Sequence, residues 1–127
     1  MPIRYSIDPA NQRMITRADG LVTFHDVNAH LDVEQRNRDL GRSELIDARA
    51  ATSDITGQQV RRLVQRAEEM FRFVDLGPTA IVTTDDVVYG MARMYSILVE
   101  RVGAAVEVFR DVQSATHWLD RMSKQDD

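Results

Sequence analysis

The chain has 127 residues, 43% of them hydrophobic, and a formal net charge of −4. A chain of this length forms one domain with a hydrophobic core of its own. Acidic and basic residues are interspersed, which argues against a nucleic-acid-binding protein, because such proteins usually carry a basic stripe. The absence of cysteine excludes disulfides and cysteine-based metal or redox sites.

The N-terminal stretch MPIRYSIDPA lacks the apolar core of a signal peptide, and no apolar run approaches membrane-spanning length. We therefore expect a cytoplasmic protein without membrane insertion. Residues 1–122 are predicted to form a single domain, and the polar residues 123–127 are predicted to form a disordered tail.

The first predicted element is a hairpin. Residues 3–7 and about 13–18 have the pattern of short strands, and DPAN between them is a turn sequence. Thr23 is then predicted to cap a helix. The charged stretch EQRNRDLGRSE beyond that helix is typical of a fraying helix end and a loop.

Strands and helices alternate over the rest of the chain. The predicted elements are a strand at 44–50, a helix from 56 to about 73, a strand at 79–84, a helix at 86–102, a strand at 105–109 and a helix at 111–122. Gly77 and Gly103 are predicted to end the second and third helices. The order β-β-α-β-α-β-α-β-α predicts an α/β fold, with a mixed, mostly parallel sheet, one antiparallel edge strand and four helices on both faces.

Polar residues lie near the predicted carboxyl ends of the strands, where ligands gather in such sheets. This strand-end cluster consists of Asp47, Arg49, Asp54, Asp85 and Asp86. Asp47, Asp85 and Asp86 could hold a magnesium ion in a metal-dependent enzyme. Thr84, Asp85 and Asp111 are also suited to cap helices, and we favour caps over a metal site because Asp and Thr are common in that role.

The three histidines are predicted to lie on the surface. His25 and His30 are five residues apart, too far round a helix to share an ion, and His117 falls on the outer side of the last helix. The chain has no G-x-S-x-G nucleophile elbow and no Gly-rich phosphate loop. Enzyme activity is therefore unsupported, and no cofactor is predicted.

The helix at 86–102 has an unusually wide apolar arc. The inward stripe is predicted to consist of Val87, Met91, Met94, Leu98 and Val102, with Ser96 on the polar side. The arc is wider than packing on one sheet requires, so it could contact a neighbouring helix, a second copy of the chain or an apolar ligand. The candidate interface or pocket residues are Val88, Met91, Ala92, Tyr95 and Val99.

The order of elements resembles the STAS domain, typified by bacterial anti-sigma factor antagonists, and its SpoIIAA-like relatives. The resemblance covers almost the whole chain and rests on two stretches, ELIDARAATSDITGQQVRRL and AIVTTDDVVYGMARMYSILVERVGAAVEVFRDVQSATHWL. The second stretch resembles a set of uncharacterised bacterial SpoIIAA-like proteins. The resemblance implies the same α/β architecture, which those relatives share with a class of lipid-binding domains.

In the antagonists, a strand runs into an Asp-Ser-Ser-Gly turn, and a partner kinase phosphorylates the first serine. The resemblance places Thr56 at that serine and Ile55 at the Asp, with Asp54 one residue earlier. Thr56 is therefore a candidate phospho-acceptor as well as a candidate helix cap. We favour the cap, because it needs no partner.

The sequence thus predicts a non-enzymatic binding or regulatory module whose partner is another protein or a second copy in a homodimer. One alternative is a carrier of an apolar small molecule or lipid, with the helix at 86–102 as its wall. The other is a metal-dependent enzyme that uses the acidic strand-end cluster.

Overall fold

In the computed structural model, which describes residues 2–125, five strands form one sheet in the order β1-β2-β3-β4-β5. β1 is antiparallel to β2, and all other neighbours are parallel. The elements are β1 (Ile3–Asp8), β2 (Arg13–Val22), α1 (Phe24–Arg36), β3 (Glu44–Ser53), α2 (Gly57–Phe71), β4 (Thr79–Val82), α3 (Asp86–Val99), the short 3-10 helix η1 (Glu100–Val102), β5 (Val106–Phe109) and α4 (Val112–Gln125). The predicted α/β fold, with its antiparallel edge strand and four helices, is confirmed.

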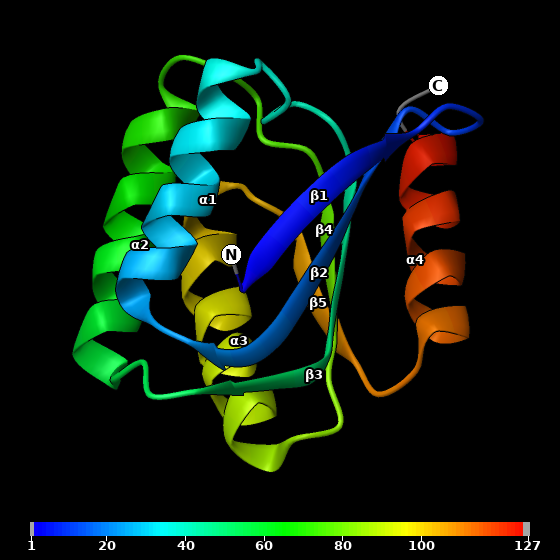
Figure 1. The fold of residues 1–127 in the computed structure, drawn as a ribbon. Coiled ribbons are helices and arrows are strands. Elements are labelled where there is room, and N and C mark those ends of the chain that lie inside the picture. The colour runs from blue at the N-terminus through cyan, green and yellow to red at the C-terminus, as the bar shows by residue number, and fades with distance from the viewer. Residues whose placement is uncertain (1, 126–127) are drawn as a thin grey trace.

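The helices are divided unequally between the two faces of the sheet. Figure 1 shows α1, α2 and α3 on one face and α4 alone on the other. Because strand order follows chain order, each right-handed crossover moves the same way across the sheet and leaves its helix on the same face. α4 follows the last strand and buries Ala115 and Leu119 against the opposite face.

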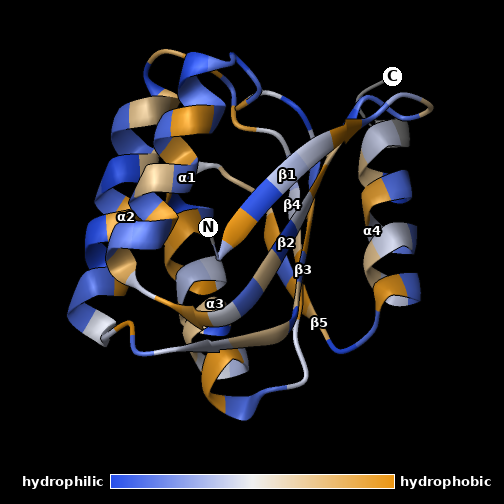
Figure 2. Cartoon of the chain, in the orientation of Figure 1, coloured by the Kyte–Doolittle hydropathy of each residue, from blue (hydrophilic) through white to orange (hydrophobic). Residues whose placement is uncertain are grey.

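α2 illustrates how the helical layer is built. Its buried residues are spaced three or four apart and are Val60, Leu63, Ala67 and Met70. Figure 2 shows hydrophilic residues along the outer side of this helix. The spacing therefore places one apolar stripe on the sheet and leaves the charged residues in solvent.

β2 and β3 are longer than predicted. Their pairing continues past an irregularity between Arg17 and Asp19 and ends with Val22 beside Ser53. β4 ends at Val82, which lies beside Asp47 in the middle of β3. The β2–β3 pair consequently projects beyond β4 and β5, so the carboxyl ends of the strands do not form one level edge.

The inward face of α3 differs from the predicted one. Val87 is 63% exposed, whereas Val88 and Val99 are buried. Ser96, predicted to be on the polar side, is buried at 5% exposure, and its hydroxyl donates to the carbonyl oxygen of Arg93. The stripe at 88, 92, 95 and 99 has the same helical spacing as the predicted one, so contacts with α2 and the sheet decide between them.

Two helix ends also differ from the prediction. α2 ends at Phe71, so Gly77 is not its terminating residue. α4 continues to Gln125, three residues beyond the predicted end at residue 122, and residues 126–127 of the predicted tail lie outside the described residues. Within residues 2–125, every helix falls short of the length and hydrophobicity that a membrane span requires.

Gly77 is required where two loops meet. Its N–H donates to the carbonyl oxygen of Leu40 at 3.1 Å. A Cβ atom built on Gly77 would lie 2.1 Å from the carbonyl oxygen of Arg42, which is backbone and cannot easily move aside. The loop before β3 and the loop before β4 can therefore approach this closely only with glycine at this position.

We expect Gly77→Ala to lower the free energy of unfolding by about 1–3 kcal/mol, the usual cost of forcing extra atoms into a packed site. Gly90→Ala is the matched control, because Gly90 lies within α3 and a Cβ there meets nothing within 4 Å. It should raise the free energy of unfolding by about 0.5–1 kcal/mol. Urea denaturation of both variants measures the difference, and equal effects would contradict this account of Gly77.

Candidate functional site

The strand-end cluster does not come together as one site. Asp47 lies in the middle of β3, where Arg49 pairs with it at 2.9 Å. Its hydrogen bonds with the Arg49 guanidinium lower the pKa of Asp47 below its ordinary value. Asp47 is therefore held as an ionised carboxylate that already has a cationic partner.

The remaining acids of that cluster have other roles. Asp85 caps α3, accepting hydrogen bonds from the N–H groups of Val87 and Val88. The side chain of Asp86 is 92% exposed and pairs with Arg110 at 3.0 Å, and Asp54 is exposed. No set of three metal-binding side chains among residues 2–125 includes any of these acids.

Thr56 lies at the N-cap of α2, directly after the loop that follows β3. Its hydroxyl accepts a hydrogen bond from the N–H of Gln59 at 3.2 Å, and its own N–H donates to the Gln59 side-chain oxygen at 2.9 Å. These two bonds form a capping box, which satisfies backbone donors that the first helical turn leaves free. The residue is exposed, and its phosphorylation stays a prediction.

A cavity of about 230 Å³ lies between the helical layer and the sheet. Four of the five predicted interface or pocket residues line it: Val88, Met91, Ala92 and Tyr95. The fifth, Val99, is fully buried in the core with Leu40 and Ala67 instead. Most of the other lining side chains are also apolar, and they come from β2, β3 and all three helices of this face.

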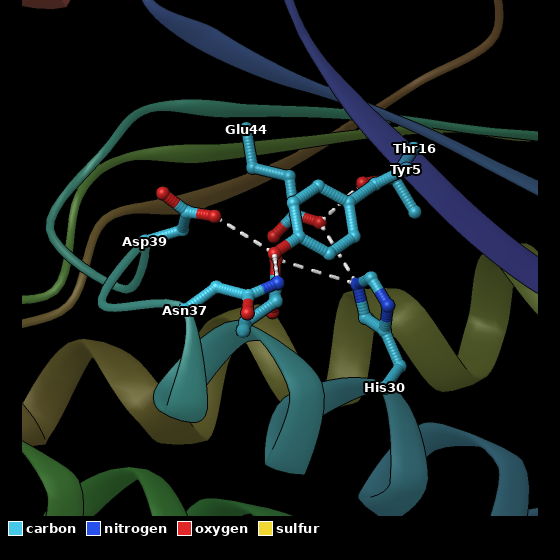
Figure 3. Close-up of polar contacts among 7 residues, drawn as sticks. Tyr5, Thr16, His30, Asn37, Asp39 and Glu44 are labelled. Carbon is cyan, nitrogen blue, oxygen red and sulfur yellow. Dashed lines mark hydrogen bonds and ion pairs between the residues drawn. The ribbon is translucent and has the colours of Figure 1, made fainter.

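Three polar side chains interrupt this apolar lining: His30 and Glu34 of α1 and Glu44 of β3. We call these three residues the buried triad. Nε2 of His30 lies 3.1 Å from Oε2 of Glu44 and 3.4 Å from Oε2 of Glu34. Figure 3 shows His30 and Glu44 pointing toward each other from the helix and the sheet. The hydroxyl of Thr16 on β2 donates to Oε2 of Glu44 and holds that carboxylate in place.

A second group of polar residues packs against the triad. The ring of Tyr5 meets the His30 ring edge to face, with 5.5 Å between their centroids. The hydroxyl of Tyr5 donates to Asp39 at 2.7 Å and accepts from the Asn37 amide at 2.8 Å. Asp39 also accepts from Arg42. These bonds tie the edge strand β1 to the loop that follows α1 (Figure 3).

The prediction that His30 lies on the surface is wrong, because its side chain is only 9% exposed. Glu34 was expected in a fraying helix end, yet α1 continues to Arg36 and buries this carboxylate. A usable signal was present in the sequence: His30 and Glu34 are four residues apart and therefore share a helix face. Glu44 gave no such signal, because a charged residue at the start of a strand usually faces solvent.

The triad has unusual protonation behaviour. Burial lowers the pKa of His30, but the neighbouring carboxylates of Glu34 and Glu44 outweigh burial and raise that pKa to about 9. Burial raises the pKa of Glu34 to about 7, and the charge of Glu44 adds to this effect. Burial also raises the pKa of Tyr95 to about 12, so its hydroxyl stays protonated beside the cavity.

Both triad shifts predict that stability falls as pH rises. Glu34 binds its proton more tightly when folded, so its contribution is lost between its ordinary pKa of 4.5 and about 7. His30 also has a raised pKa, so its contribution is complete below 6.5 and is lost as pH rises through about 9. The summed loss should be on the order of a few kcal/mol.

This pH dependence is measured by urea denaturation at several pH values from 5 to 9. A chelator in the buffer keeps stray metal ions from affecting the carboxylates. The variant carrying both His30→Gln and Glu34→Gln should lose most of the slope that these groups contribute. His25→Gln, which changes an exposed histidine of the same helix, should keep the slope of the unmodified protein. An unchanged slope in the double variant would show that other groups cause the pH dependence.

The geometry at Thr56 predicts a cost for removing its hydroxyl. Thr56→Ala should lower the free energy of unfolding by about 1 kcal/mol, whereas Thr56→Asp should cost little because Asp also caps helices. Thr84→Ala is the matched control, since Thr84 is exposed and the cap of the next helix is Asp85. Thermal or urea unfolding distinguishes these variants, and an equal effect of the two alanine substitutions would argue against the cap.

No family model and no curated protein sequence matches this chain. Among solved structures, the chain is similar to an uncharacterised protein of the DUF3478 family with a SpoIIAA-like fold, from Shewanella loihica PV-4. The two chains are 15% identical, the match covers 92% of this chain and 93% of that chain, and the TM-score is 0.61. The likeness concerns the fold, and it shows that this chain has the SpoIIAA-like fold that the resemblance of its sequence implied.

Proposed function

We propose that this protein is a non-enzymatic binding module that holds a small, largely apolar molecule between its helical layer and its sheet. The observation that carries the proposal is the cavity of about 230 Å³ with its mainly apolar lining. Protein interiors are normally packed without voids larger than a water molecule. A space of this size with an apolar lining is therefore the candidate binding site of this chain.

The size of the cavity limits the ligand. An apolar cavity of roughly 150 Å³ holds a benzene-sized molecule, and pockets for drug-sized ligands begin at about 300 Å³. The ligand is accordingly somewhat larger than benzene, such as a substituted aromatic ring or a short branched aliphatic group. Met91 suits such a role, because its flexible side chain adapts to the shape of what it contacts.

The polar groups on the wall give the site its specificity. Tyr95, with a hydroxyl that stays protonated, and the buried triad line the cavity together with apolar side chains. A ligand with one hydrogen-bonding group on an apolar body would satisfy both parts of such a wall. Its chemical class is therefore an amphiphilic small molecule rather than a pure hydrocarbon.

Two residues argue against the wide arc of α3 as the interface of a homodimer. Val88 and Val99, both predicted as contact positions, are buried within the chain itself. The exposed apolar residues of α3 are Val87 and Ile97 instead. The arc is explained by packing within the chain and by the cavity wall, so the proposal needs no second copy.

The proposal is tested with the purified protein and a small apolar fluorescent probe. We expect saturable binding of one probe per chain, and Ala92→Leu should weaken it by at least about tenfold, because the larger side chain fills part of the cavity. Native mass spectrometry of freshly purified protein should also detect a released small molecule from the unmodified chain and less of it from the variant.

Ile97→Ser is the matched control, because Ile97 is exposed on the same helix and does not line the cavity. This variant should bind the probe as the unmodified protein does. If Ile97→Ser abolishes binding while Ala92→Leu leaves it unchanged, the probe binds the surface of α3. That result, or the absence of saturable binding, would overturn the proposal.

A further inference from the structure

We propose that His30, Glu34 and Glu44 form a binding site for one divalent transition-metal ion. Among residues 2–125, these three side chains can each offer one ligand atom with all three atoms within 4.8 Å of one another. One imidazole nitrogen and two carboxylate oxygens form a donor set that suits ions such as Zn²⁺ and Mn²⁺. This site is separate from the strand-end cluster and uses none of its residues.

The distances within the triad fit a coordination sphere. Nε2 of His30 lies 3.1 Å from the Glu44 oxygen and 3.4 Å from the Glu34 oxygen. In a tetrahedral zinc site with bonds of about 2.0–2.2 Å, neighbouring ligand atoms are separated by roughly 3.3–3.6 Å. The two distances from His30 are therefore close to the edges of such a tetrahedron. All three ligand atoms lie within 4.8 Å of one another, so rotations of the glutamate side chains would bring them onto one face.

One oxygen of the triad makes no hydrogen bond, although it lies 3.4 Å from Nε2 of His30. Oε2 of Glu34 is buried without a hydrogen bond, and its side chain is only 1% exposed. It is the one buried side-chain oxygen or nitrogen among residues 2–123 without a hydrogen bond. Buried polar atoms are nearly always satisfied, and a carboxylate oxygen aimed at a histidine nitrogen and a second carboxylate is placed to bind a cation.

The charge balance points the same way. Within the described residues, Glu34 and Glu44 form ion pairs with His30 and with no arginine. When both carboxylates are ionised, a single imidazolium leaves the triad with one net negative charge, which is costly away from water. A divalent ion bound by a neutral imidazole and both carboxylates would make the group neutral as a whole.

The surroundings hold the three ligands in place. His30 and Glu34 project from adjacent turns of α1, and the Thr16 hydroxyl fixes the orientation of Glu44. Tyr5 packs against the His30 ring. Such supporting contacts position metal ligands and strengthen binding. All three ligands line the cavity, so the remaining coordination positions would be reached from there by water or by a polar group of a cavity ligand.

The test is a titration of the chelator-treated protein with Zn²⁺, followed by calorimetry and by thermal unfolding. We expect one ion per chain and a rise in melting temperature, because an ion that binds only the folded state stabilises it. His30→Gln and Glu34→Gln should each weaken binding by at least about tenfold, the loss that follows even from removing a residue that only supports the ligands.

Two controls make the result specific. His25→Gln changes an exposed histidine on α1 and should leave zinc affinity unchanged. Ala92→Leu changes a cavity residue that is not one of the three ligands and should keep zinc binding, so the metal site and the proposed function are tested separately. Circular dichroism of each variant verifies that it is folded before the affinities are compared.

A direct measurement at the ligand completes the test. The imidazole nitrogen signals of His30 in an NMR spectrum should shift on addition of zinc, in proportion to occupancy. The proposal is overturned if a folded protein binds no stoichiometric zinc. It is equally overturned if the folded His30→Gln and Glu34→Gln variants bind zinc as tightly as the unmodified protein, since the ion would then lie at another place.

Discussion

The direction of three successive crossovers decides where everything else in this fold lies. Each right-handed connection from β2 to β5 adds its strand on the same side of the previous one, so α1, α2 and α3 share a face. Three helices must then cover a sheet whose β2–β3 pair projects beyond its neighbours. This layer forms one wall of the cavity, while α4 covers the other face with fully buried side chains such as Leu119.

The polar residues of this layer come mainly from one crossover. α1 carries His30 and Glu34, β3 begins with Glu44, and the loop between them supplies Asn37 and Asp39. One short stretch thus contributes to the buried triad and to the hydrogen bonds that hold the edge strand β1 through its tyrosine. The charged stretch that looks like a solvated loop in the sequence is, in the folded chain, the most interconnected polar region.

The fold followed from local patterns, and much of the site did not. The turn in DPAN, the capping residues and the apolar spacing in α2 each depend on neighbours in the sequence, and they were sufficient for the order and type of the elements. The facing of α3 was mispredicted because apolar residues surround much of that helix, so contacts with α2 select the buried stripe. The spacing of His30 and Glu34 places them on one face of α1, but packing of α1 on the sheet, which the spacing does not reveal, decides that this face is buried.

Among the described residues, no arginine pairs with the carboxylates of the triad, and this affects how related sequences can change. Losing His30 alone would leave two carboxylates facing each other in the interior, and losing Glu44 alone would remove the partner of both His30 and Thr16. Each single replacement therefore destabilises the fold more than a joint replacement by apolar residues, as holds for buried charge pairs in general. We therefore expect positions 30, 34 and 44 to change together among related sequences, which should carry either all three charged residues or three apolar ones.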